Sequence, residues 1–178
     1  MAVLLDRLAG RFAELEDELN ALDAAAGDGD HGATILRGLR AAAAADADAD
    51  PVAAFRTAAG GASGSLFAQV LSAVLAISSG EGPGPALGAA AKRIGVLGQA
   101  KPGDRTMLDA LIPASKAPDL ASAATAAADG AAATAGMAAK RGRARYVEGA
   151  GTGHVDAGAR SVAEILAVLV ESTTETGT

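Results

Sequence analysis

The residues best suited to chemistry lie in one short acidic loop, LDAAAGDGDHG at 22–32, which contains Asp23, Asp28, Asp30 and His31. Glycine permits tight backbone curvature, so the three carboxylates can converge, but converging anions repel unless a cation neutralises them. Hard oxygen ligands in this number suit Mg²⁺, which commonly shares its coordination shell with phosphates. The loop therefore predicts a metal and phosphate site. The alternative is a solvated turn, because Asp and Gly are also common turn and helix-capping residues.

A second glycine-rich segment, GGASGSL at 60–66, opens a predicted helix. Backbone N–H groups at a helix start, together with the hydroxyls of Ser63 and Ser65, favour phosphate binding. The alternative is that the three glycines only permit a tight turn and a close helix crossing. The sequence contains no GxxxxGKS/T pattern and no GxGxxG between a strand and a helix, so a nucleotide site must be built in another way.

Two further segments combine charged residues with glycine. KPGDRTMLDALIP at 101–113 predicts a helix capped by Asp104, in which Asp109 pairs with Arg105 at i+4. KRGRARYVEGAGTGHVDAGA at 140–159 places three arginines before a glycine-rich turn that leads into another helix. Arginine in such a place commonly binds phosphate through two hydrogen bonds, and the alternative is a helix C-terminus, where cations favour the dipole.

The elements that must position these residues are predicted to be helices. Apolar residues recur at steps of three and four, and glycine-rich breaks separate the periodic stretches. Helices are predicted over 3–22, 33–45, 51–59, 65–79, 85–98, 105–116, 119–139 and 157–172. No alternating, β-branched run predicts a strand. The 49 alanines leave few large apolar side chains, so backbones must pack closely. The chain is predicted to be a single all-α domain over 1–178.

Composition argues against several function classes. Fifteen basic against 21 acidic residues give a net charge of -6, which makes nucleic acid a poor candidate partner. The absence of cysteine removes disulfides and thiolate metal sites. We expect no uncharged, strongly apolar stretch of 18 residues, and Asp6 and Arg7 interrupt the region where a signal peptide needs an apolar run. A soluble, cytoplasmic protein without membrane contact is therefore expected.

Four segments in this order resemble the ADP-binding L subunit of dihydroxyacetone kinase and the related nucleotide domain of single-chain, ATP-dependent kinases. The resemblance covers nearly the whole chain and rests on the segments LDAAAGDGDHG, GGASGSLF, PGDRTMLDALIP and RGRARYVEGAGTGHVDAGARS. It implies an all-helical antiparallel barrel with the nucleotide bound at one end. Fatty acid kinases share the GDGDHG loop, but the last segment is closer to the sugar-kinase branch.

The resemblance also implies the roles of individual residues. It makes Asp23, Asp28 and Asp30 the ligands of two Mg²⁺ ions that bridge the phosphates of ADP or ATP, and the catalytic residues are these three with Arg143. The residues implied to surround the nucleotide are His31, Gly32, Ala33, Thr34, Ser63, Gly64, Gly103, Ile112, Arg143, Asp156, Ala157 and Gly158. Within that group, Gly103 and Ile112 are expected to border the base. The chain departs from the residues usual in the family at Thr34, Ser65, Arg105, Ile112 and Ala157.

Phosphoryl transfer needs alignment and charge neutralisation more than covalent help, so three aspartates and an arginine are sufficient equipment. The resemblance implies a glycerone kinase type of activity in glycerol metabolism, with the small ketone held on a separate K subunit. The donor is either ATP or a phosphocarrier M subunit of the phosphotransferase system that recharges bound ADP. A second copy of the chain is a further candidate partner. Two alternatives are a nucleotide-sensing module that docks to a transcription regulator and a structural helical domain that merely binds metal.

Overall fold

A computed structural model describes residues 2–25 and 27–176, and every regular element in those ranges is helical. The α-helices are α1 (Ala2–Ala24), α2 (His31–Ala43), α3 (Pro51–Ala59), α4 (Gly61–Ser78), α5 (Pro83–Gly98), α6 (Leu108–Ser115), α7 (Leu120–Ala133) and α8 (Ala157–Thr176). Three short 3-10 helices follow α7, namely η1 (Thr134–Gly136), η2 (Arg143–Tyr146) and η3 (Glu148–Gly151). The predicted all-α, single-domain fold of about eight helices is confirmed.

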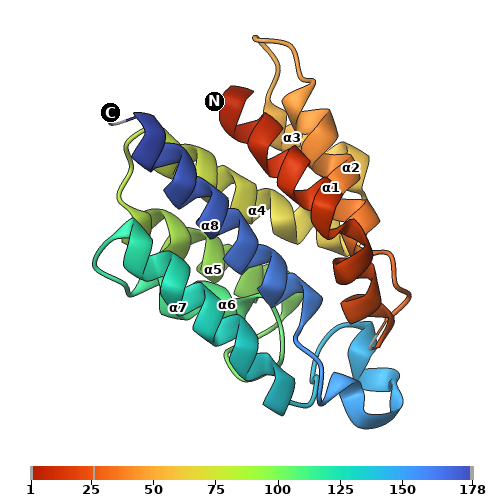
Figure 1. The fold of residues 1–178 in the computed structure, drawn as a ribbon. Coiled ribbons are helices and arrows are strands. Elements are labelled where there is room, and N and C mark those ends of the chain that lie inside the picture. The colour runs from red at the N-terminus through yellow and green to blue at the C-terminus, as the bar shows by residue number, and fades with distance from the viewer. Residues whose placement is uncertain (1, 26, 177–178) are drawn as a thin grey trace.

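The helices pack as neighbours in chain order, and α8 closes the bundle by packing against α1 and α7 (Figure 1). The two termini lie at one end of the bundle. The segment 139–156, here called the strap, lies at the other end, beside the loop that joins α1 to α2 (Figure 1). This arrangement brings together two of the segments that the sequence marked for chemistry.

The core combines leucine-rich and alanine-rich helix faces. In α1 the periodic residues Leu4, Leu8, Phe12, Leu15 and Leu19 are all buried, as their spacing predicts. In α7 the buried residues are alanines only, Ala123, Ala127 and Ala131. A Cβ atom at Gly130 would lie 2.3 Å from the carbonyl oxygen of Asp109, so α7 rests directly on the backbone of α6. In this part of the core, close packing of helix backbones therefore takes the place of large side chains, as the high alanine content predicts.

Four predicted helix boundaries differ from the structure by three residues or more. One is the end of α8, which lies at Thr176 and not at 172. Helix α4 begins at Gly61 and not at 65, because Gly60 and Gly61 take φ values of 70° and 60° and reverse the chain within a single turn. Helix α6 begins at Leu108 and not at 105, and its predicted cap, Asp104, is buried beneath the strap. The alanine-rich helix predicted over 119–139 ends at Ala133 and continues as η1.

One helix, α4, is long and apolar enough to cross a membrane by length and composition. Gly61–Ser78 is an uncharged but weakly apolar stretch of 18 residues, whereas the sequence prediction concerned strongly apolar stretches. Half of that stretch, 50%, is nevertheless buried inside the protein, where Phe67, Val70 and Leu71 belong to the common core. Half of this apolar stretch therefore contributes to the core of the bundle.

The crossing of α1 and α2 depends on Gly32. A Cβ atom there would lie 2.3 Å from the carbonyl oxygen of Glu16 and 3.0 Å from Oδ1 of Asn20, so the two helices approach too closely for any side chain. The backbone N–H of Ala33 donates to the same Asn20 Oδ1 at 3.2 Å. This contact determines where the loop between the two helices lies.

We expect Gly32→Ala to lower the free energy of unfolding by roughly 1–3 kcal/mol, because the methyl group must push against backbone. Gly10→Ala is the matched control, since nothing lies within 4 Å of a Cβ at that helical position. Its expected effect is a gain of about 0.5–1 kcal/mol from helix propensity. Urea unfolding followed by circular dichroism measures both, and equal stability of the two variants would contradict the close crossing.

Candidate functional site

The three aspartates of the acidic loop converge, as the sequence predicts. Asp23 lies in the last turn of α1, Asp28 lies in the loop and Asp30 immediately precedes α2. One carboxylate oxygen from each lies within 4.8 Å of the others. Asp28 and Asp30 are exposed and Asp23 is half-buried, so the cluster is open on one side.

Backbone donors hold the loop against the end of α1. Oδ2 of Asp23 accepts the N–H of Gly29 at 2.9 Å and the N–H of Asp30 at 3.1 Å. Gly29 has a φ of 75°, and a Cβ at Gly27 would lie 2.8 Å from Oδ1 of Asp23. Asp30 stands at the N-cap position of α2 but makes no side-chain capping bond. The turn interpretation thus accounts for Asp23 and does not account for Asp30.

His31, the first residue of α2, turns inward from the loop. Its Nε2 lies 2.9 Å from Oγ of Ser161 on α8, and its ring meets the edge of Phe67 with the centroids 5.3 Å apart. Burial lowers the pKa of His31, while the nearby carboxylates of Asp23 and Asp30 raise it by less. The imidazole is therefore neutral at pH 7, and Ser161 determines how its ring is oriented.

A cavity of about 650 Å³ opens beside the aspartates. The predicted site residues that line it are Asp23, Asp30, His31, Thr34, Ser63, Asp156, Ala157 and Gly158. The first residues of α4, 61–63, also line it, and by helix geometry their N–H groups have no partner within the helix. The apolar residues that line the cavity are Leu66, Phe67, Ile94, Leu97 and Met107. The volume and the mixed lining are typical of small-molecule sites.

Several predicted residues lie elsewhere. Gly32 and Ala33 pack on α1 behind the cavity wall. Gly64 is buried against Ala59, and its N–H donates to the carbonyl of Gly60 at 2.9 Å, so that amide is already engaged. Asp28 belongs to the carboxylate cluster but does not line the cavity.

The two residues expected to border the base are also outside the cavity wall. Gly103 has a φ of 81° and donates its N–H to Oδ1 of Asp109 at 2.5 Å. Ile112 packs against the common core from α6. The backbone of Arg143 forms the start of η2, but its side chain lies outside the described part of the structure. Arg141 and Ala144 of the same segment line the cavity.

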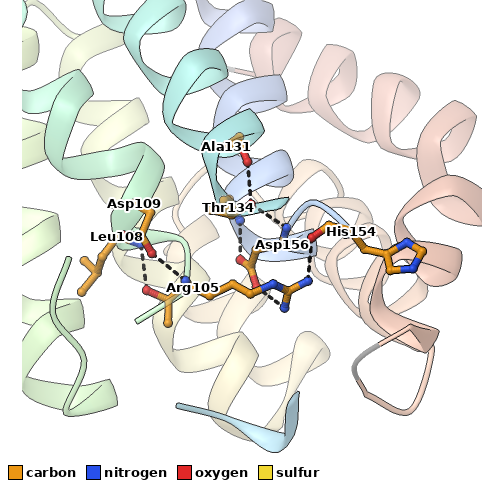
Figure 2. A network of polar contacts seen from close by, with 9 residues as sticks. Arg105, Leu108, Asp109, Ala131, Thr134, His154 and Asp156 are labelled. Carbon is orange, nitrogen blue, oxygen red and sulfur yellow. Dashed lines mark hydrogen bonds and ion pairs between the residues drawn. The ribbon is translucent and has the colours of Figure 1, made fainter. Parts of the chain in front are cut away.

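Sequence reasoning missed a buried polar network around Arg105 (Figure 2). The predicted pair of Arg105 with Asp109 does not form, because Asp109 accepts the N–H groups of Gly103 and Thr106. Arg105 instead donates to the carbonyl oxygen of His154 at 2.9 Å and lies 3.8 Å from Oδ2 of Asp156. These partners are far apart in the chain, so no local spacing signals the contact.

Asp156 joins this network to the start of α8. Its Oδ1 accepts the N–H of Ala159 at 2.8 Å, and its own N–H donates to Oγ1 of Thr134 at 2.8 Å (Figure 2). Burial raises the pKa of Asp156 to about 6, although the bond from Ala159 and the charge of Arg105 both lower it. The site therefore contains a carboxylate that titrates just below neutral pH.

The chain belongs to the DAK2 domain family, whose sequence pattern matches residues 25–171. It is 38% identical over 190 residues to the L-erythrulose 1-kinase of Mycolicibacterium smegmatis, covering 91% of this chain and 33% of that protein. It is 35% identical over 198 residues to the triokinase/FMN cyclase of Homo sapiens, covering 96% of this chain and 34% of that protein. The chain therefore spans about a third of the length of these relatives.

The fold is also similar to a solved structure, that of the dihydroxyacetone kinase of C. freundii in complex with AMP-PNP and Mg2+. The TM-score is 0.69 with 28% sequence identity, covering 96% of this chain and 33% of that one. These relatives and this structure are each named as a kinase, and the chain is similar to about a third of each.

The raised pKa of Asp156 predicts a specific pH dependence of stability. The folded state holds the proton up to about pH 6, whereas the unfolded chain releases it near the ordinary value of 3.8, so the free energy of unfolding falls as pH rises between these values. In Asp156→Asn, which keeps a side chain able to cap α8, this fall is expected to shrink by on the order of 2 kcal/mol. Urea unfolding at a series of pH values measures it, and parallel pH profiles for wild type and variant would rule the prediction out.

Proposed function

We propose that this chain is the nucleotide-binding phosphotransfer part of a small-ketone or ketose kinase of the dihydroxyacetone kinase type. The observation that carries the proposal is the convergence of Asp23, Asp28 and Asp30 within 4.8 Å, beside a cavity of about 650 Å³, in a chain of this family. The relatives named L-erythrulose 1-kinase and triokinase support a small keto sugar or triose as the substrate class.

The carboxylate cluster fits a divalent cation. Its donors are hard oxygens, two of the three aspartates are exposed, and Asp23 uses one oxygen for backbone donors and keeps the other. We assign Asp23, Asp28 and Asp30 as the residues that hold two Mg²⁺ ions. When bound, Mg²⁺ would supply neutralisation of the phosphate charge during transfer.

The remaining cavity walls fit the other parts of ADP or ATP. Gly61, Ala62 and Ser63 at the start of α4 line the cavity, where a helix N-terminus favours an anion. Leu66, Leu97 and Met107 form an apolar wall suited to a base. The amides of 61–63, rather than that of Gly64, are the donors that we assign to the phosphates.

Among the residues described, the groups lining the cavity that could act as a general base are Asp23 and Asp30, which we assign to the metal, together with His31 and Asp156. His31 is neutral but tied to Ser161, and Asp156 is engaged with Ala159 and Arg105. We therefore propose that a separate chain of the K type binds and activates the substrate, and that this chain presents the phosphoryl group. The donor is ATP or a phosphocarrier of the M type, both of which place the protein in the cytoplasm.

Isothermal titration calorimetry with Mg-ADP and Mg-ATP tests nucleotide binding. Asp28→Asn and Asp30→Asn are expected to reduce Mg²⁺-dependent affinity by at least about tenfold, because each removes a charged oxygen ligand. Asp48→Asn is the matched control, since Asp48 lies in the exposed loop between α2 and α3. Absence of Mg²⁺-dependent binding by the wild type would falsify the proposal.

The melting temperature measured without and with metal tests whether the three aspartates bind a metal ion or only stabilise the loop. Asp30→Asn is expected to leave the melting temperature in EDTA unchanged or raised, because repulsion within the cluster falls. The same variant is expected to lose the rise in melting temperature that Mg²⁺ and ADP give the wild type. If Asp30→Asn lowers the melting temperature in EDTA by as much as it does in Mg²⁺ and ADP, Asp30 only stabilises the loop.

Reconstitution with a substrate-binding chain tests phosphoryl transfer itself. We expect transfer to dihydroxyacetone or erythrulose only when both chains, Mg²⁺ and a donor are present. Omitting the phosphocarrier, and then ATP, identifies the donor. Tight nucleotide binding with no transfer to any ketone would instead favour a nucleotide-sensing module.

A further inference from the structure

Two adjacent charged residues, Asp104 and Arg105, are buried where the loop 101–107 meets the strap. Asp104 is 1% exposed and Arg105 is 2% exposed. Arg105 also has a φ of 58°, a conformation that costs free energy for any residue other than glycine. Burying two charges and one strained backbone position requires compensating contacts. The N–H of Lys101 donates to Oδ2 of Asp104 at 3.1 Å from within the loop, and the strap supplies further contacts.

Asp104 contacts the beginning of the strap. Its carbonyl oxygen accepts the N–H of Lys140 at 3.0 Å, and its Oδ2 lies 3.5 Å from Nε of Arg141. Nζ of Lys140 also donates to the carbonyl oxygen of Gly103 at 3.0 Å. Arg141 lines the cavity, so these contacts determine where one wall begins.

Arg105 contacts the end of the strap. Its Nη2 donates to the carbonyl oxygen of His154, and its Nη1 faces the carboxylate of Asp156 (Figure 2). The η3 turn passes directly over the guanidinium, because a Cβ at Gly151 would lie 2.5 Å from Cζ of Arg105. Gly151 has a φ of 74°, so both the space and the backbone conformation there require glycine.

We propose that Asp104 and Arg105 form a clamp that holds both ends of the strap and thereby positions the cavity wall formed by 141–144 and 156–158. Arg105 itself lines the cavity. Its contacts with His154 and Asp156 also make it a positioning residue for the strap, and the exchange of the strap tests that role separately from any direct contact with a ligand. Because this wall is already ordered before binding, binding of the ligand does not include the entropic cost of ordering the wall. The clamp itself is independent of the ligand, and only its effect on affinity rests on the proposed nucleotide binding.

Hydrogen exchange of the full chain without ligand, followed by mass spectrometry, tests the clamp directly. In Arg105→Met, exchange in 139–156 is expected to rise at least about tenfold, while exchange in α1 and α2 stays at the wild-type level. Gly151→Ala keeps the arginine but displaces its guanidinium, and is expected to raise exchange in the same segment. Arg93→Met, on the exposed face of α5, is the control and is expected to change nothing.

Two further readouts distinguish positioning from general stability. The pKa of Asp156, measured by carboxyl carbon NMR, is expected to rise in Arg105→Met because the cation that lowers it is gone. Arg105→Lys retains the charge but lacks the fork that contacts His154 and Asp156 together, so it is expected to restore the pKa and only part of the exchange protection. Among wild type, Arg105→Lys and Arg105→Met, we expect a variant with less exchange protection of the strap to have a lower affinity for Mg-ADP.

The outcomes separate the clamp from the nucleotide proposal. Wild-type exchange in 139–156 for both Arg105→Met and Gly151→Ala would overturn the clamp, whatever the nucleotide affinities. A rise in exchange spread over α1, α2 and α4 would also overturn it, by showing that Arg105 stabilises the whole fold. If the wild type fails to bind Mg-ADP, the nucleotide proposal fails, and the exchange data still decide the clamp.

Discussion

Mutual repulsion among three carboxylates is the constraint on which the candidate site depends. Asp23, Asp28 and Asp30 bring oxygens within 4.8 Å of one another, where like charges repel. Two backbone N–H groups offset part of this at Asp23, and a divalent cation is the chemical partner able to offset the remainder. The loop, the ends of α1 and α2 and the neighbouring cavity are all consistent with such a partner.

Small residues make this arrangement geometrically possible. Gly32 lets α2 rest on the backbone of α1, and Gly130 lets α7 rest on α6 in the same way. Helices that approach this closely bury little side-chain volume, so the core relies on leucine-rich faces such as that of α1 for apolar area. At one end of this bundle lies the cavity, which residues of the strap help to line.

Prediction from sequence succeeded where the signal was local. The apolar period of α1, Pro51 at the start of α3 and the convergence of the acidic loop all follow from spacing over a few residues. Prediction failed at the starts of α4 and α6, where paired left-handed glycines and the side chain of Asp109 set the boundary. Gly103 and Ile112, which the resemblance implied would border the base, do not line the cavity, because a motif does not specify which face of a helix or loop borders a cavity.

The sequence by itself determined the all-helical class, the family and the clustering of the three aspartates, because residue type and short spacing specify each of these. Tertiary structure alone decided which residues border the cavity and which hold them in place. Arg105 meets Asp156 and His154 only after α6, α7 and the strap have packed. Contacts of that kind depend on helix crossings that close backbone packing sets, and no local pattern encodes them.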